Sequence, residues 1–177
     1  AAMPVTRVLS SVPERLAEAE TCIAGESWEW DQVRFRLVHP QANSPFEGND
    51  RSCVLLIESR YGRVLLPGDL AAKAERALVK RVDVPLQAEI LVVPHHGSKS
   101  SSTAQFLDAV QPRMALLPVG YRNRYRHPHP SVVARYQERG IALNDSAKAG
   151  AISVRFGAQG LQLNRHRDDQ RRYWHGQ

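Results

Sequence analysis

The chain has 177 residues, of which 42% are hydrophobic and 24% are charged, so it can bury a core without disulfide or metal staples. No apolar run approaches the ~20 residues of a membrane-spanning helix and no signal segment opens the chain, which predicts a soluble piece whose parent protein could still be membrane-bound. The net charge of +6 favours polyanionic partners, with a surface that is basic only for solubility as the alternative.

The first half of the chain is dominated by short segments in which apolar and polar residues alternate, a pattern that predicts strands. We expect a strand at 6–10, a helical turn or loop at 13–20, a hairpin of 28–30 with 33–38, a loop at 41–50, and strands at 52–58 and 64–66. The turn Arg60-Tyr61-Gly62 joins the last two strands.

In the second half, helical and strand patterns alternate. We expect helices at 70–81, 103–110 and 131–139, strands at 89–93 and 114–119, and a closing hairpin of 151–156 with 161–164. Ser101 or Ser102 should cap the second helix, and Gly140 should end the third. This order predicts one domain with a mixed sheet and helices on its outer face.

The two cysteines, Cys22 and Cys53, do not form a metal-binding spacing. They allow a pair of buried free thiols or one disulfide, and we favour structural thiols. The sequence does not indicate the redox compartment.

Two of the predicted strands end in residues that commonly bind metals. The strand at 64–66 is followed by Pro-Gly-Asp69, and the strand at 89–93 by Pro-His95-His96. A carboxylate and imidazoles at rigid strand tips suit a metal or phosphate site. The alternatives are that Asp69 only caps the following helix and that the histidines are ordinary turn residues.

Adjacent side chains on an extended backbone point to opposite faces, so at most one of His95 and His96 should ligate a given ion. The other histidine would orient its neighbour, contact the substrate or act as general acid. Ser98 and Lys99, which follow directly, could add donors for an anion.

A third cluster is the segment Asn-Arg-Tyr-Arg-His-Pro-His-Pro at 123–130. His127 and His129 have the spacing of a two-histidine metal clip, but no Asp or third His follows at a useful distance. We therefore favour substrate contact by Asn123 and His127.

Further polar residues could contact an anionic substrate. Three arginines gather in the third cluster, namely Arg122, Arg124 and Arg126. Asn49 and Ser52 stand at the entry to the strand that precedes the Asp69 strand, where they could face the site or serve only the turn.

Together these segments resemble the C-terminal metallo-β-lactamase-like domain of the ComEC family, channel proteins of natural competence that take single-stranded DNA across the inner membrane. The resemblance covers about residues 34–156 and rests on 65–69, 93–98 and 123–128, with Glu75 between them and the loops at 48–52 and 150–152. The Gly-Asp and His-His-Gly-Ser motifs, in this order and spacing, are its specific part.

The resemblance implies an α/β fold, a four-layer αββα sandwich with mixed sheets and outer helices. This chain would supply the C-terminal half to two-thirds of it, as a partial domain at 1–165 followed by a basic tail at 166–177. The family's activity would be hydrolysis of a phosphodiester bond in DNA, with divalent metal ions (zinc or manganese, two in a complete site), directed at the strand that is not imported.

The resemblance also implies roles for single residues. Asp69 would bridge the two ions, and His96, or else His95, would ligate the second ion while its neighbour lies near the scissile phosphate. His127 and Asn123 are similar to the family's late phosphate-contact segment.

The sequence departs from the metallo-β-lactamase pattern in one respect. Its seven histidines, at 39, 95, 96, 127, 129, 166 and 175, do not form the early His-x-His-x-Asp-His cluster, which in the family sits upstream of where this chain begins. Too few ligands remain for two ions. We therefore expect weak metal binding, poor hydrolysis and association through the uncovered inner face of the sheet.

Two other functions remain open. The chain could be a non-catalytic module that holds single-stranded nucleic acid with its arginines and stacks bases on Tyr121, Tyr125, Tyr173 or Trp174. It could also be a hydrolase similar to phosphorylcholine esterases. For the ComEC-like reading, the expected partners are DNA and the membrane channel of the same parent protein, in a bacterial inner membrane.

Overall fold

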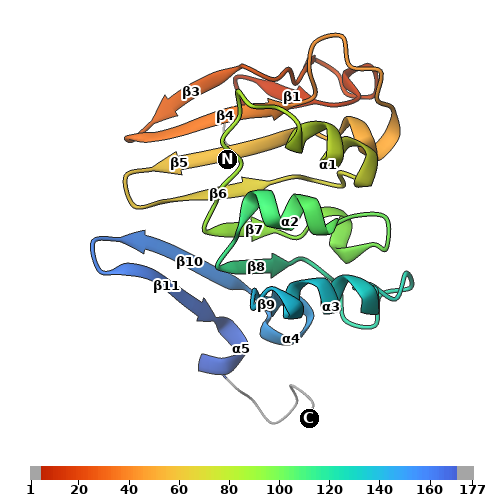
Figure 1. The fold of residues 1–177 in the computed structure, drawn as a ribbon. Coiled ribbons are helices and arrows are strands. Elements are labelled where there is room, and N and C mark those ends of the chain that lie inside the picture. Colours follow the sequence, from red (N-terminus) through yellow and green to blue (C-terminus); the bar gives the residue numbers. More distant parts are fainter. Residues whose placement is uncertain (1–4, 171–177) are drawn as a thin grey trace.

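The computed structural model describes residues 5–170 (Figure 1). Its centre is a seven-stranded sheet in the order β3-β4-β5-β6-β7-β8-β9. These strands are β3 (Ser27–Trp30), β4 (Val33–His39), β5 (Val54–Ser59), β6 (Gly62–Leu66), β7 (Ile90–Val92), β8 (Met114–Leu117) and β9 (Ala142–Asp145). Strands β3 to β6 pair antiparallel and β6 to β9 pair parallel. The predicted mixed sheet is confirmed, although β9 was missed.

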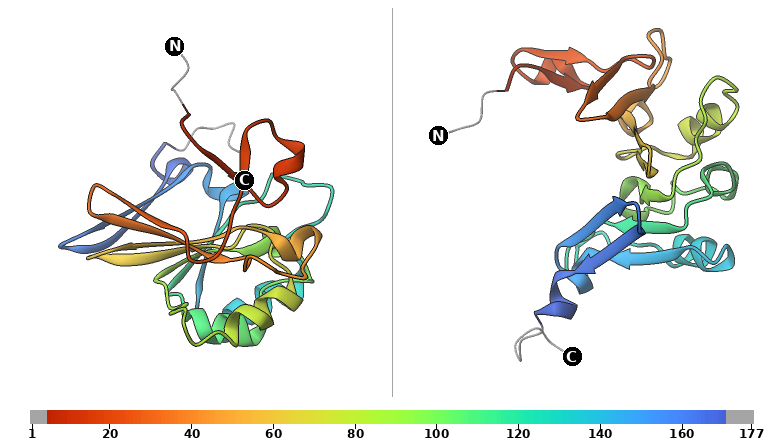
Figure 2. Two further views of the ribbon diagram at one scale, coloured as in Figure 1. Left: turned by 90° about the horizontal axis from the view of Figure 1, so that it is seen from above. Right: turned by 90° about the vertical axis from the view of Figure 1, so that its left-hand side faces the viewer.

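Three helices, α1 (Ala72–Val79), α2 (Ala104–Val110) and α3 (Pro130–Glu138), connect the parallel strands, because parallel neighbours need crossover connections. All three cover the same face of the sheet (Figure 2). The core lies between these helices and the sheet, where Tyr136, Phe106 and Leu56 are fully buried. The predicted helical layer is therefore confirmed.

The starts of two helices differ from the prediction. Asp69 does not cap α1, which begins later; the Asp50 side chain instead accepts a hydrogen bond (3.1 Å) from the backbone of the first turn of α1. Helix α2 is capped by the hydroxyl of Thr103, and not by Ser101 or Ser102. Asp69 is thus left free of a capping role, and the loop at 48–51 is fastened to α1.

A small N-terminal unit lies beside the main sheet. It consists of the parallel pair β1 (Val8–Ser10) and β2 (Ala19–Thr21) with the short helix η1 (Pro13–Arg15) between them. Cys22, directly after β2, forms a disulfide with Cys53, directly before β5. The structure therefore has the disulfide, and the preference for two free thiols was wrong, because the ends of β2 and β5 bring the two cysteines together.

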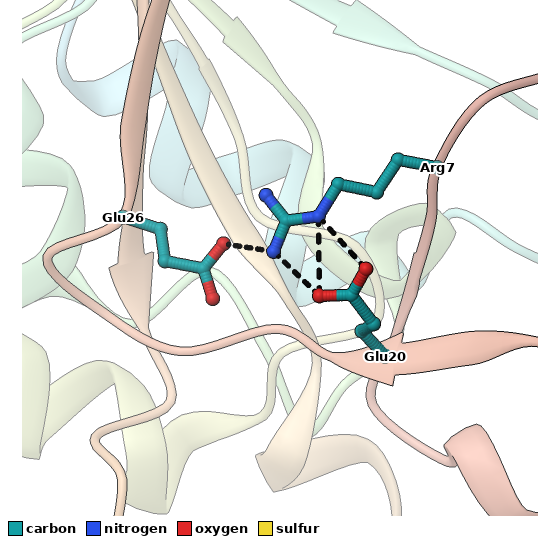
Figure 3. A network of polar contacts seen from close by, with 3 residues as sticks. All are labelled: Arg7, Glu20 and Glu26. Atoms are coloured by element: carbon teal, nitrogen blue, oxygen red, sulfur yellow. Dashed lines mark hydrogen bonds and ion pairs between the residues drawn. The ribbon is translucent and has the colours of Figure 1, made fainter.

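A polar network also holds this unit (Figure 3). The Arg7 guanidinium, just before β1, contacts Glu20 of β2 at 2.8 Å and Glu26, just before β3, at 3.0 Å. All three side chains are partly exposed, and exposed ion pairs stabilise a fold only weakly. The disulfide is therefore the stronger link between the N-terminal unit and the sheet.

The C-terminal part contains α4 (Ser146–Ala149), the hairpin of β10 (Ile152–Gly157) and β11 (Gly160–Arg165), and α5 (His166–Asp169). The hairpin, which was predicted, lies on the face of the sheet opposite the three helices (Figure 2). Helix α5 falls within the segment predicted as a basic tail. Tyr173 and Trp174 lie outside the described residues. Within residues 5–170, the helices are too short or too polar to cross a membrane.

Candidate metal and phosphate site

Four segments that carry the predicted site residues meet at one edge of the sheet, on the right in Figure 1. Asp69 follows β6, the pair His95-His96 follows β7, and the loop at 118–129 follows β8. These strands are parallel neighbours, so their carboxyl ends share an edge, where ligands of such sheets bind. The short helix η2 (Gly48–Arg51) precedes β5, which is antiparallel to β6, so Asn49 lies at the same edge.

The His96 side chain has the arrangement of a metal ligand. Its Nδ1 lies 2.7 Å from the carbonyl oxygen of Pro118, so this nitrogen carries the proton and donates it. Its Nε2 is therefore unprotonated in the neutral ring and lies 3.6 Å from an Asp69 carboxylate oxygen. Two ligands ~2.1 Å from one tetrahedral zinc lie ~3.4 Å apart. The spacing fits a shared cation, and the backbone acceptor on the other nitrogen is typical of metal-bound imidazole.

His95 is held differently from its neighbour. Its Nε2 lies 3.1 Å from the side-chain amide nitrogen of Asn49. Its Nδ1 is buried and has no hydrogen-bond partner among the described residues. Its ring lies 6.2 Å from the His127 ring in an edge-on arrangement. The ring nitrogen that lies near the Asp69 carboxylate is Nε2 of His96, at 3.6 Å, which favours His96 as the ligand.

The backbone of the two histidines is not extended, contrary to the prediction. They lie in the short helix η3 (Pro94–Gly97) with left-handed φ values of 49° for His95 and 53° for His96. The argument that an extended chain points them to opposite faces was therefore wrong, although they do make separate contacts. Left-handed backbone costs roughly 1–2 kcal/mol per non-glycine residue, so the surrounding structure must hold this turn.

Glu75 of α1 provides part of that support and was missed as a site-shaping residue. Its carboxylate is fully buried and accepts hydrogen bonds from the backbone N–H of Ser102 (2.6 Å) and of Thr103 (2.8 Å). The hydroxyls of Ser102 and Tyr136 lie 3.1 Å apart. Burial raises the pKa of Glu75, which these backbone donors oppose. This contact fixes the chain just after the histidine turn against α1 and α3.

The loop after β8 is shaped by Asn123. Its amide nitrogen donates to the carbonyl of His127 (2.8 Å) and its amide oxygen accepts from the N–H of His127 (2.9 Å). Its contact with a phosphate stays a prediction, since the side chain here serves the loop. His129 accepts from the N–H of Ser131 as the cap of α3, a use that differs from a metal clip.

Gly97 allows the histidine turn to meet this loop. It has φ +78°, and a Cβ built there would lie 2.7 Å from a side-chain carbon of Pro128. The carbonyl of Gly97 also accepts a hydrogen bond from the N–H of His129 (2.9 Å). Only glycine combines this φ with such a close approach.

The surroundings of His127 shift its pKa. Partial burial, followed by the nearby imidazoles of His95, His96 and His129, lowers the pKa of His127, while Asp69 raises it. A lower pKa favours a neutral His127 ring at neutral pH.

The other predicted contact residues have simpler surroundings. The Ser52 hydroxyl donates to the carbonyl of Asn49 (2.8 Å) and shapes η2. The Ser98 hydroxyl lies 3.1 Å from that of Ser100. Lys99 is exposed, and three exposed arginines stand in the loop after β8, namely Arg122, Arg124 and Arg126.

These residues fit part of a metal centre. Within residues 5–170 there is no group of three or more His, Cys, Asp and Glu side chains that could hold an ion, whereas a catalytic zinc takes three protein ligands. Asp69 and His96 supply two. Asp69 and His96 could therefore be part of a metal site, but they do not form a complete one.

Comparison with known proteins finds relatives that include competence proteins. It is 34% identical over 165 residues to the competence protein ComA of Neisseria gonorrhoeae, covering 93% of this chain and 24% of ComA. It is 31% identical over 150 residues to ComE operon protein 3 of Bacillus subtilis, covering 85% of this chain and 19% of that protein. The chain thus spans about a fifth to a quarter of these relatives. No family model matches it.

A solved structure shows the same fold. The "Putative metal-dependent hydrolase" of Parabacteroides distasonis superposes with a TM-score of 0.52 at 14% sequence identity, covering 80% of this chain and 64% of that one. The predicted fold class, a metallo-β-lactamase-like arrangement of mixed sheet and outer helices, is confirmed by this likeness.

Proposed function

We propose that this chain is part of a metal-dependent hydrolase that cleaves phosphodiester bonds of DNA during uptake, because its relatives include the competence protein ComA and ComE operon protein 3 and a metal-dependent hydrolase shares its fold. The single observation that carries the proposal is the pairing of Asp69 with His96. A carboxylate and a correctly protonated imidazole meet, 3.6 Å apart, where the carboxyl ends of three parallel strands share an edge.

In this proposal Asp69 and His96 hold a divalent ion, zinc or manganese, which supplies Lewis-acid chemistry when bound. His95, steadied by Asn49, faces the scissile phosphate. His127, kept neutral by its surroundings, accepts or donates a proton beside it.

Basic, hydroxyl and amide side chains around the edge would bind the DNA backbone. The proposed contacts are Asn123, Ser98, Lys99, Ser52, Arg122, Arg124 and Arg126. Guanidinium and ammonium groups bind phosphates whatever the base sequence. This binding should therefore weaken steeply with salt.

The shortage of ligands shapes the expected behaviour. Since the described residues supply two ligands, we propose that further ligands come from another segment of a longer protein. The chain alone should then bind metal weakly and cleave DNA poorly. A membrane channel in that longer protein, and self-association through the inner sheet face, are part of the same proposal.

Substitution of Asp69 by Asn tests the proposal. Asp69→Asn keeps the side-chain shape and removes the charge, so affinity for Mn²⁺ or Zn²⁺ should fall at least about tenfold, by analogy with the loss of supporting groups at metal sites. Titration calorimetry measures it on the chain, and nuclease assays measure activity on a longer protein that contains the chain. Asp31→Asn, in the β3–β4 turn at the opposite end of the sheet, is the control. Unchanged metal affinity and unchanged cleavage in Asp69→Asn would refute the assignment.

A non-catalytic nucleic-acid-binding module is the second candidate. It is favoured by Arg122, Arg124 and Arg126, which form no ion pair with an acidic side chain among residues 5–170. DNA binding that persists in chelator without any cleavage by the longer protein would favour it. Competition between DNA and a phosphorylcholine diester distinguishes both candidates from a phosphorylcholine esterase, which would prefer the small diester.

A further inference from the structure

The loop at 120–127, which we call the arginine–tyrosine loop, displays two large aromatic rings to solvent beside the site. Tyr121 is 73% exposed and Tyr125 is 63% exposed. A guanidinium lies over each ring, that of Arg122 at 5.2 Å from the Tyr121 centroid and that of Arg124 at 4.7 Å from the Tyr125 centroid. Single exposed rings are common on protein surfaces, but here two of them lie in one short loop, and the guanidiniums over them show that their faces accept a cationic or planar group.

Tyr125 is connected to the candidate site by a series of rings. It stacks on His127 with a centroid distance of 5.8 Å and an interplanar angle of 19°. The His127 ring meets the His95 ring edge-on at 6.2 Å. Because the side chain of Asn123 bonds both backbone groups of His127, the position of this series is fixed by the fold. The stack therefore leads from solvent to the histidine turn.

The same loop carries unbalanced positive charge. Arg122, Arg124 and Arg126 are exposed, and within the described part of the chain none of them pairs with a carboxylate. Guanidinium groups bind phosphates with two parallel hydrogen bonds and stack on planar rings. Alternating rings and guanidiniums are what a strand with unpaired bases requires, since each nucleotide offers one plane and one phosphate.

We infer that Tyr125 is a base-stacking residue that makes the site select single-stranded over duplex nucleic acid. An unpaired base takes the position of the Arg124 guanidinium over the ring, and the freed guanidinium binds the adjacent phosphate. A duplex cannot engage the ring in this way because its bases are already stacked on each other. The inference deepens the proposed function and rests on it only for the presence of a phosphate at the neighbouring site.

The matched control is Tyr61 in the β5–β6 turn. It is 42% exposed and has the guanidinium of Arg60 4.6 Å from its ring centroid. That turn is at the amino end of β6, opposite the edge that carries the site (Figure 1). Tyr61 and Tyr125 thus share an exposed phenol ring with a guanidinium near it, and only Tyr125 also stacks on His127 beside the site.

The test is fluorescence anisotropy of a labelled oligothymidine with the chain, in chelator and at fixed salt, so that cleavage does not contribute. Tyr125→Ala should weaken binding about five- to 150-fold, the range for loss of one base stack. Tyr125→Phe and Tyr61→Ala should stay within about twofold. An abasic oligonucleotide of equal length should bind more weakly and should not distinguish Tyr125→Ala from the unaltered chain.

Equal binding by Tyr125→Ala and Tyr61→Ala overturns the inference, as does an abasic strand or a duplex that binds as tightly as oligothymidine. The arginines of the loop would then bind the phosphates of the nucleic acid without any base stacking on Tyr125. Failure of the proposed function looks different: Asp69→Asn would leave metal binding and cleavage unchanged while the Tyr125 dependence of single-strand binding persists.

Discussion

Reducing the Cys22–Cys53 disulfide should destabilise the chain by an amount that follows from its place in the sequence. The bond joins residues with a sequence separation of 31. For a loop of this length, the chain-entropy relation gives a loss of ~12 cal/mol/K in the unfolded chain, or about 3.7 kcal/mol at 25 °C. Reduction restores this entropy to the unfolded state, so the free energy of unfolding should fall by that amount.

Urea unfolding followed by tryptophan fluorescence measures the effect, because Trp28 and Trp30 lie on β3, next to the N-terminal unit. For a denaturant slope of about 2 kcal/mol per molar, the midpoint should drop by roughly 1.8 M in reductant. The double variant Cys22→Ala, Cys53→Ala is the control, and its midpoint should not respond to reductant. If reductant shifts the unaltered chain no more than the double variant, the bond does not restrict the unfolded chain and the reasoning is wrong.

The same perturbation should reach the candidate site. Cys53 directly follows Ser52, whose hydroxyl holds the carbonyl of Asn49, and Asn49 contacts His95. Reduction should therefore shift the NMR resonances of the His95 ring. The ring of His129, which caps α3, should not respond.

Two other predictions concern buried groups. Glu75→Ala leaves two backbone donors without an acceptor and should lower the free energy of unfolding by about 2–6 kcal/mol. Tyr136→Phe removes one hydroxyl contact of the same cluster and should lower it by about 1 kcal/mol. Chemical denaturation of both variants measures the difference. Burial lowers the pKa of His39 below 6.5, the ordinary value for histidine, so the unfolded chain takes up this proton first as the pH falls. Stability should be full above pH 6.5 and should decrease below it, and the decrease should be smaller in His39→Gln when unfolding is measured on both sides of that pH.

The convergence of the site could be predicted because it depends on strand order alone. Asp69 and His95-His96 each follow an apolar strand, and the carboxyl ends of parallel strands meet at one edge. The Gly-Asp and His-His-Gly-Ser motifs carried the family resemblance from which the fold was predicted, and the structural likeness confirms that fold. For the convergence of these residues, the positions of the apolar strands in the sequence were therefore sufficient.

Other features depend on contacts between segments that are distant in sequence. The left-handed turn at His95 and His96 cannot be recognised from an alternation of apolar and polar residues, because it is held by loops from three elements. Glu75 took part in the family resemblance, but the sequence does not show that its carboxylate accepts hydrogen bonds from the N–H groups of Ser102 and Thr103. The Cys22–Cys53 bond could not be chosen over free thiols, since two cysteines in sequence do not reveal whether their strands are neighbours.

The two adjacent histidines have different surroundings, because a different ring nitrogen of each is held by a neighbouring segment. In His96 the carbonyl of Pro118 occupies Nδ1 and leaves Nε2 toward Asp69. In His95 the amide of Asn49 occupies Nε2 while Nδ1 is buried. Pro118 lies in the loop after β8 and Asn49 lies in η2, between β4 and β5. Both of these segments would have to move for His95 and His96 to exchange contacts. The fold thereby places the imidazole of His96 beside the Asp69 carboxylate and holds the imidazole of His95 near Asn49 and His127.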